Sequence, residues 1–157
     1  MPDFHRKSII VDAILGTGVN KPVTGMLSNW IDHINLQTNM VVSVDMPSGM
    51  PTEGICTGVA IRSTKVITFQ KPKLSFFLRD NDEFCPYWKV VDIGLSRSFI
   101  KDLDPSTYLI NRKLVAQIYM IRKRHSHKGD YGHALIIAGS EGKIGAAILA
   151  TTACLRA

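Results

Sequence analysis

The chain has 157 residues, which suffices for one domain with a sizeable core, or for one domain and a fraction of another. Apolar residues make up 45% and charged residues 20%, and these fractions exclude a disordered tail, a collagen-like repeat and a mucin-like stalk. With 19 basic and 13 acidic side chains the net charge is +6, which suits anionic small molecules as well as nucleic acids and does not choose between them.

The sequence indicates neither export nor membrane insertion. No apolar run approaches the roughly 18 residues that a membrane span needs, and the first residues lack the apolar region of a secretory signal. The three cysteines, Cys56, Cys85 and Cys154, are widely spaced and match neither a disulfide framework nor a CxxC metal site. We therefore expect buried thiols in a reducing cytoplasm.

The first residues have the pattern of a parallel α/β unit. Residues 8–15 form an apolar run rich in Ile and Val that ends at a Gly-Thr-Gly turn, which predicts a buried strand. Pro22 then opens a helical pattern. Its apolar face consists of Val23, Met26, Leu27, Trp30, Ile31 and Ile34. Residues 40–44 predict a second buried strand, and strand, helix and strand in this order indicate a parallel sheet.

Further elements extend this unit and begin another. Short strands are predicted at residues 65–70, 74–78 and 88–93, all in the same sheet. A polar linker at 101–107 and a short helix at 111–121 follow. The remaining elements are a basic stretch at 122–129, a buried strand at 134–138, a glycine-rich loop at 139–145 and an apolar helix from Ala146. One strand and one helix cannot bury their apolar faces, so we expect the second unit to be cut off.

Polar residues follow two neighbouring strands of the predicted sheet. Asp12 lies within the first strand, and Asp45 and Ser48 lie at the end of the second. Ligands of parallel sheets gather at the carboxyl ends of the strands. We therefore expect Asp12, Asp45, Ser48 and the loop at 16–22 to surround one crevice.

Each of these residues has a structural as well as a functional interpretation. The loop from Gly16 to Pro22 could hold a phosphate with its backbone N–H groups and Lys21, or it could be a plain tight turn. It is not a GxGxxG fingerprint, because Lys21 stands where the third glycine belongs. A buried Asp12 needs either a hard cation or several hydrogen-bond donors. Asp45 could be a general acid or base, or it could cap a turn.

Several short motifs are similar to those of a known enzyme family. Val-Asp-Ala-Ile-Leu-Gly-Thr-Gly at 11–18 and Val-Asp-Met-Pro-Ser-Gly at 44–49, with residues 68–73 and 91–95, resemble the second half of an NAD(P)H-hydrate epimerase domain. Residues 126–132, with 137–140 and 145–147, resemble the opening of the ribokinase-like, ADP-dependent NAD(P)H-hydrate dehydratase domain. This order resembles that of the bifunctional nicotinamide nucleotide repair proteins of bacteria, over nearly the whole chain.

The resemblance implies an α/β fold with an incomplete Rossmann-like three-layer parallel sheet, followed by the first strand and helix of a ribokinase-like domain. Residues 1–100 would be epimerase, 101–124 linker and short helix, and 125–157 the start of the dehydratase. The implied activities are epimerisation of the R and S forms of hydrated NADH and NADPH, and dehydration of the S form with ADP and Mg²⁺. A cytoplasmic enzyme is implied, homo-oligomeric in its full-length parent. The residues themselves indicate no membrane partner, and the basic stretch at 122–128 is too short, and too poor in interleaved aromatic residues, to favour nucleic-acid binding.

The resemblance also implies roles for individual residues. Asp12 and Ser48 correspond to family residues that bind a potassium ion, and Asp45 to the residue that contacts the hydrated nicotinamide and transfers the proton. The phosphate loop of the family corresponds to Gly16, Thr17, Gly18, Val19, Asn20, Lys21 and Pro22. Ala146 and Ala147 correspond to substrate contacts of the dehydratase.

The chain departs from the family pattern at both ends. It contains neither the Asn-Asn-Gly-Gly-Asp loop that completes the epimerase site nor the nucleotide loop and catalytic Asp of the dehydratase. We therefore expect a middle piece of a bifunctional enzyme that lacks both complete active sites. The alternative is a non-catalytic binding module, because epimerase-like domains also occur in scaffolds that bind proteins. The presence of Asp12, Asp45 and Ser48 favours the enzyme.

Overall fold

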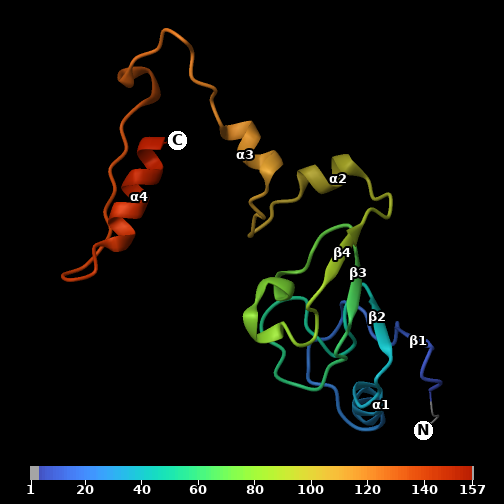
Figure 1. Ribbon diagram of the computed structural model, residues 1–157. Helices are drawn as coiled ribbons and strands as arrows, with labels where there is room; N and C mark the ends of the chain where they lie inside the picture. Colours follow the sequence, from blue (N-terminus) through green and yellow to red (C-terminus); the bar gives the residue numbers. More distant parts are fainter. Residues whose placement is uncertain (1–3, 157) are drawn as a thin grey trace. The chain divides into compact units, whose positions relative to one another are not determined.

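A computed structural model describes residues 4–156 of the chain. Its internal contacts divide the chain into two compact units, Met1–Asp104 and Pro105–Ala157 (Figure 1). The first unit contains the sheet and both clusters of buried apolar residues. It therefore holds everything that positions the candidate site around Asp12 and Asp45.

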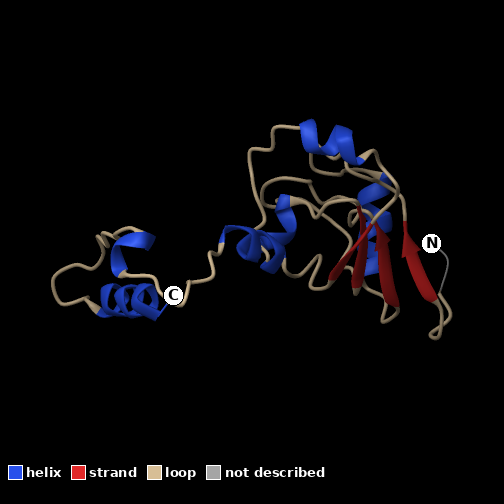
Figure 2. Ribbon diagram, turned by 90° about the horizontal axis from the view of Figure 1, so that it is seen from above, coloured by secondary structure: helices blue, strands red, loops and turns tan. Residues whose placement is uncertain are grey.

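The first unit is built on a four-stranded parallel sheet. The strands β1 (Ile9–Asp12), β2 (Met40–Val44), β3 (Lys65–Phe69) and β4 (Trp88–Val91) lie side by side in that order (Figure 2). Helix α1 (Met26–Asn35) connects β1 to β2, as a parallel crossover requires. The α/β fold class expected from the sequence is confirmed.

Burial alternates along the strands because successive side chains point to opposite faces of a sheet. On the covered face, Ile10 of β1 and Val41 of β2 pack against Ile31 and Ile34 of α1. Asp12 lies two residues after Ile10, on the same covered face, and is buried as a result. On the opposite face, the side chains of Ile9, Val11 and Met40 are 59%, 64% and 51% exposed.

The helix after β1 begins later than the sequence pattern indicates. The pattern opens at Pro22, whereas α1 begins at Met26 and has Gly25 as its N-cap residue. Gly25 has a φ of 68°, a left-handed backbone conformation that glycine adopts without steric cost. Val23 lies before the helix but still packs against the same core as Ile31 and Ile34, as the apolar pattern predicts. The loop from Gly16 to Pro22 therefore does not lead directly into a helix N-terminus.

The strand predicted at 74–78 is wrong. These residues form the 3₁₀ helix η1 (Leu74–Phe77), followed by η2 (Arg79–Asn81). The physical reason is the strand order: β4 pairs directly with β3, so the segment between them has no free strand to join. The apolar residue Phe76 is buried all the same, because the turn directs it into the core around Met46 and Val66.

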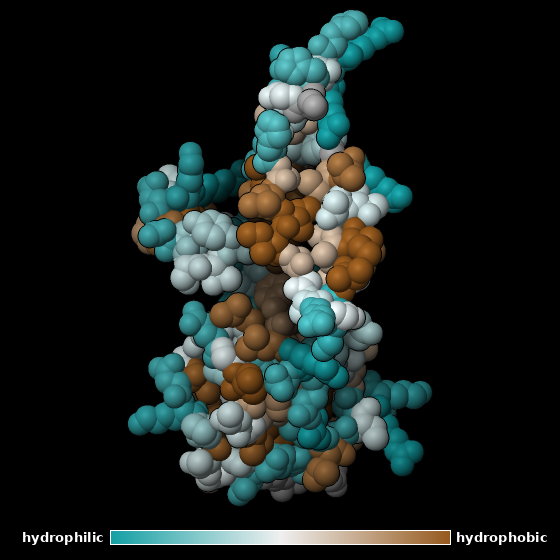
Figure 3. Space-filling view, turned by 90° about the vertical axis from the view of Figure 1, so that its left-hand side faces the viewer, coloured by the Kyte–Doolittle hydropathy of each residue, from teal (hydrophilic) through white to brown (hydrophobic). Residues whose placement is uncertain are grey.

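The second unit contains short helices and little buried surface. Helix α2 (Arg97–Asp102) belongs to the first unit, while α3 (Arg112–Ile118), η3 (Lys128–Tyr131) and α4 (Gly145–Arg156) belong to the second. Neither α3 nor α4 has a buried residue. Large apolar side chains are exposed here, among them Leu135, Ile137, Ile148 and Leu149, and Figure 3 shows how widely such side chains reach the surface.

The strand predicted at 134–138 is also wrong, because these residues have no regular structure. A strand needs a neighbour to satisfy its backbone groups, and the part of the second unit that the structure describes contains no other strand. A ribokinase-like fold for this unit therefore stays a prediction. Among the described residues, no helix is long and apolar enough to cross a membrane.

The unequal faces of the sheet predict unequal costs of substitution. Ile10→Ala should lower the free energy of unfolding by about 2–5 kcal/mol, because it leaves a cavity among Ile31, Ile34 and Val41. Val11→Ala should cost less than about 1 kcal/mol, since this neighbouring side chain is exposed. Denaturant unfolding of the two variants measures the difference. Equal losses would contradict a sheet that is covered on one face only.

The second unit should be the less stable part of the chain. Amides of α4 and of residues 135–137 should exchange with solvent faster than those of β2, because no burial in α3 or α4 offsets the entropy of ordering the backbone. Hydrogen exchange followed by mass spectrometry of the purified chain tests this expectation. Strong protection of Leu135 to Ile137 in a proven monomer would contradict it.

Candidate functional site

The buried carboxylate of Asp12 lies at the centre of a hydrogen-bonded cluster. Its Oδ1 accepts from the Ser48 hydroxyl at 2.5 Å and, at 3.4 Å, from the backbone N–H of Ile14. Its Oδ2 accepts from the Ser43 hydroxyl at 2.7 Å and from the Ser48 N–H at 2.8 Å. The side chain is 1% exposed, so these donors replace the water that the carboxylate loses on burial. The structure thus places Asp12 and Ser48 in direct contact.

The hydrogen bonds of this cluster show whether Asp12 and Ser48 have oxygens free for the expected cation. Carboxylate and hydroxyl oxygens are the ligands that hard cations prefer. However, donors take up all four acceptor positions of the Asp12 carboxylate, and Ser48 Oγ also accepts from the Leu15 N–H at 2.8 Å. Among the described residues, no three His, Cys, Asp or Glu lie together as a metal-binding group. Asp12 and Ser48 do not by themselves form a cation site.

Asp45 forms a second polar cluster, at the carboxyl end of β2 beside β3. It has a φ of 65°, a left-handed conformation that costs a non-glycine residue about 1–3 kcal/mol and is typical of functional sites. Its Oδ1 accepts from Lys73 Nζ at 2.6 Å, from the Phe69 N–H at 3.0 Å and from the Thr68 hydroxyl at 3.1 Å. These hydrogen bonds from described residues all end on Oδ1, which leaves Oδ2 uncommitted.

The surroundings of Asp45 favour its charged form. Burial by itself would raise the pKa of this carboxyl, but three influences outweigh it: the hydrogen bond and positive charge of Lys73, the Phe69 N–H and the Thr68 hydroxyl. The pKa of Asp45 therefore lies below its ordinary value. With a side chain that is 17% exposed, Asp45 is an ionised carboxylate that a ligand can reach.

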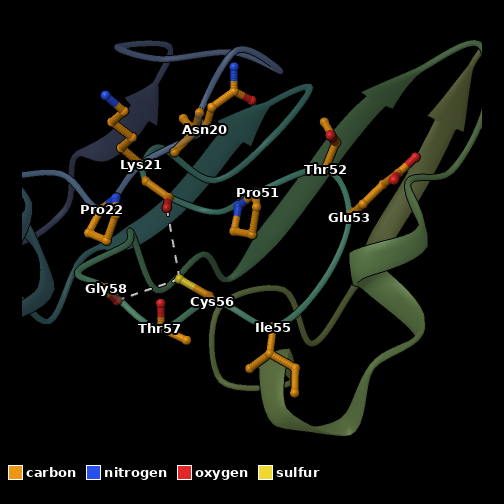
Figure 4. Close-up of a pocket in the computed structure, with 12 residues that line it drawn as sticks. Asn20, Lys21, Pro22, Pro51, Thr52, Glu53, Ile55, Cys56, Thr57 and Gly58 are labelled. Atoms are coloured by element: carbon orange, nitrogen blue, oxygen red, sulfur yellow. Dashed lines mark hydrogen bonds between the residues drawn. The ribbon is translucent and has the colours of Figure 1, made fainter.

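The loop from Gly16 to Pro22 borders two cavities. One, of about 430 Å³, is lined by Leu15, Gly16, Gly18, Val19, Asn20, Lys21 and Val23. The other, of about 390 Å³, lies between residues 19–22 and the segment 49–58 (Figure 4). A Cβ atom added at Gly16 or Gly18 would meet no atom within 4 Å, so the loop leaves open space at both glycines.

Cys56 lines the second cavity, where its surroundings favour the neutral thiol. Its sulfur faces the carbonyl oxygens of Gly49 and Gly58, as the dashed lines in Figure 4 show. Burial raises the pKa of this thiol, and the nearby charge of Glu83 acts in the same direction, although a backbone hydrogen bond at Gly58 opposes them. The thiolate that a nucleophile requires is therefore disfavoured.

The predicted site residues thus fall into three groups. Asp12 and Ser48 are in contact, and the loop at 16–22 faces the segment that begins just after Ser48. Asp45 lines neither cavity and belongs to the cluster with Lys73. Ala146 and Ala147 lie in α4 of the second unit, where Ala146 is exposed and Ala147 partly buried.

Sequence reasoning missed Lys73 and Thr68 as site residues. Both belong to the motif at 68–73, which was recognised only as part of a family pattern. Their spacing of five residues has no helical or strand periodicity, because a turn at Gln70, with a φ of 60°, brings the two side chains together. The available signal was a lysine in the turn that follows β3, the strand beside the one whose end carries Asp45.

Comparison with known proteins connects this geometry to a family. The family model described as YjeF-related protein N-terminus matches residues 2–75. This match includes Asp12, the loop at 16–22, Asp45, Ser48 and Lys73.

Curated relatives match nearly the whole chain. The bifunctional NAD(P)H-hydrate repair enzyme Nnr of Coxiella burnetii is 33% identical over 156 residues, which are 99% of this chain and 32% of that protein. The enzyme of the same name from Moorella thermoacetica is 34% identical over 155 residues, 95% of this chain and 28% of the relative. The Escherichia coli enzyme of the same name is 31% identical over 150 residues, which are 95% of this chain and 29% of that protein.

The chain spans about a third of the length of the curated relatives that it matches. Its similarity to them includes both units, and the match to the family model lies within the first. Residues 2–75 are thus similar to the YjeF-related N-terminal family, and the chain as a whole is similar in sequence to bifunctional NAD(P)H-hydrate repair enzymes.

Proposed function

We propose that the first unit serves the epimerisation of hydrated NADH and NADPH, with Asp45 as the residue that transfers the proton. The observation that carries this proposal is the state of the Asp45 carboxylate: ionised, partly exposed at a strand end, and with Oδ2 uncommitted. The printed name of the relatives, NAD(P)H-hydrate repair enzyme, supports the substrate class.

Interconversion of the R and S forms requires that a bond at one carbon breaks and forms again on the other face. A carboxylate can assist by accepting a proton from the substrate and returning it, so that no net change in protonation results. Oδ2 of Asp45 is the oxygen available for this exchange, because Oδ1 is already bound by three donors. The low pKa of Asp45 means that the carboxylate is ready as a base at neutral pH.

The loop from Gly16 to Pro22 would hold the phosphates of the dinucleotide. Gly16 and Gly18 leave space for a phosphate to approach the backbone, and Lys21 borders both cavities with a positive charge. Phosphates are favourable ligands for backbone N–H groups and lysine side chains. The position of this loop beside the strand end of β1 agrees with the general location of ligands in parallel sheets.

Three further parts of the proposal rest mainly on the resemblance of sequence motifs. The second unit, with Ala146 and Ala147, would contribute to dehydration of the S form with ADP and Mg²⁺, since the relatives are named bifunctional. A potassium ion at Asp12 and Ser48 would need further oxygen ligands and would displace hydrogen bonds that now occupy the Asp12 carboxylate, whose oxygen chemistry otherwise suits a hard cation. The expectation that all three thiols are buried is wrong for Cys154, which is exposed, and for Cys56, which is half-buried; all three are free, as in a cytoplasmic enzyme.

Asp45→Asn should abolish epimerisation and preserve the fold. An amide still accepts hydrogen bonds from Lys73 and Thr68 but cannot accept the substrate's proton. The rate of interconversion of the hydrate epimers is measured with the full-length gene product, alongside Asp80→Asn, an exposed carboxylate of the same unit, as the control. Interconversion by Asp45→Asn at the wild-type rate would show that another group transfers the proton. Absence of activity in the unsubstituted protein would favour a non-catalytic binding module.

Potassium should raise the thermal unfolding midpoint of the chain, because a ligand that binds the folded state stabilises it. The comparison is between KCl and tetramethylammonium chloride at equal ionic strength. Ser48→Ala lowers the midpoint in both salts, since hydrogen bonds to Asp12 and Leu15 are lost, but it should also reduce the increment due to potassium. Equal midpoints of the wild-type chain in the two salts would exclude a potassium site in this structure.

A further inference from the structure

Lys73 is a largely buried lysine that contacts the carboxylate of Asp45. It directly follows Pro72 in the segment after β3, and its side chain is 16% exposed. Its Nζ donates to Asp45 Oδ1 at 2.6 Å and to Thr68 Oγ1 at 2.9 Å, and it lies 3.2 Å from the Phe69 carbonyl oxygen. A fourth acceptor, the Lys71 carbonyl oxygen, lies at 3.4 Å.

These contacts determine what Lys73 can do. An ammonium group has three N–H donors, and four protein acceptors surround this one. Lys73 therefore has no donor left over for a substrate phosphate. Its effect on a ligand must pass through the residue that it binds most closely, which is Asp45.

We propose that Lys73 is a positioning residue for Asp45: by binding Oδ1 together with Thr68, it directs Oδ2 toward the substrate. The same contact places a positive charge beside the carboxylate. This inference rests on the proposed role of Asp45 in proton transfer. Lys73 is the charged side chain, among those described, that contacts Asp45. The other groups packed against the carboxylate from β3, Thr68 and the Phe69 N–H, are neutral.

A purely structural role explains the ion pair less well. Burying a pair of charges removes both from water, so a buried salt bridge is weak evidence for stability. Here Asp45, one member of the pair, has a left-handed φ of 65°, and Gln70, in the turn that leads to Lys73, has a left-handed φ of 60°. Such conformations are retained where the surrounding structure needs a side chain in one position.

The first test is made on this chain and needs no activity. The pKa of the Asp45 carboxyl is measured by carbon-13 NMR in the wild type, in Lys73→Met and in the control Lys71→Met, whose side chain is exposed and two residues away. Lys73→Met should raise the pKa of Asp45 by about 1–3 pH units, because burial then acts without a nearby positive charge. Lys71→Met should leave it unchanged. An unchanged pKa in folded Lys73→Met would overturn the proposal.

The second test separates positioning from charge. Lys73→Arg retains the positive charge and should keep the pKa of Asp45 low, but its longer, planar group holds Oδ1 differently. We expect kcat for epimerisation by the full-length gene product to fall about ten-fold or more, with a smaller change in KM. This variant also tests the proposal if Lys73→Met fails to fold. Wild-type kcat in Lys73→Arg would overturn the positioning role.

The third test is the pH profile of the same enzyme. In Lys73→Met the acidic limb of kcat/KM should move to higher pH by as much as the pKa of Asp45 rises, because the base is then protonated at a higher pH. A fixed limb in an active Lys73→Met enzyme would overturn the role of Lys73 while the proposed function stands. An inactive wild-type protein would overturn the proposed function instead, and the NMR measurement would still show whether Lys73 sets the charge of Asp45.

Discussion

The buried carboxylate of Asp12 is the interaction on which the rest of the first unit depends. It joins the end of β1 to the loop after β2, because Ser43 and Ser48 both donate to it. A buried carboxylate without such donors would be very costly, so the loop must stay where its N–H and hydroxyl groups reach Asp12. The position of the loop that follows Asp45 is thereby determined by a residue in another strand.

This loop is tightly packed as well as hydrogen-bonded. Met46 and Met50 are buried in the core, and the Ser48 carbonyl accepts from the Ile61 N–H at 2.9 Å. Gly49 has a φ of 98°, and a Cβ atom added there would lie 2.2 Å from the Val59 carbonyl oxygen, which only glycine avoids. Close packing therefore requires glycine at position 49, and the Asp12 carboxylate requires the donors of Ser48.

Asp45, at the start of this loop, has a left-handed backbone conformation. Its N–H still donates to the Ile67 carbonyl at 2.8 Å, as in a strand, but its left-handed φ turns the chain away from the sheet. The carboxylate consequently meets Thr68 and Lys73 of the next strand and turn. The Asp12 carboxylate is therefore fully hydrogen-bonded within the fold, whereas that of Asp45 keeps one oxygen uncommitted, although both residues stand at the carboxyl ends of adjacent strands.

The sequence by itself determined the elements whose signal is local. The apolar runs before Asp12 and Asp45 predicted β1 and β2, and the short helix predicted at 111–121 is confirmed as α3, with Asn111 as its N-cap. The contact between Asp12 and Ser48 also follows from local signals. Parallel strands bring their carboxyl ends to one edge of the sheet, and a carboxylate in an apolar strand must find donors there.

Only the tertiary structure decided the features that depend on neighbours. Residues 74–78 and 134–138 have apolar runs like those of strands, yet neither is a strand, because a strand forms only where another strand offers backbone partners. The ion pair of Lys73 with Asp45 joins residues 28 positions apart. The periodic spacing of apolar residues shows which face of a segment is buried. The ion pair depends instead on the order of the strands and on the turn at Gln70. Neither of these features produces a periodic pattern in the sequence.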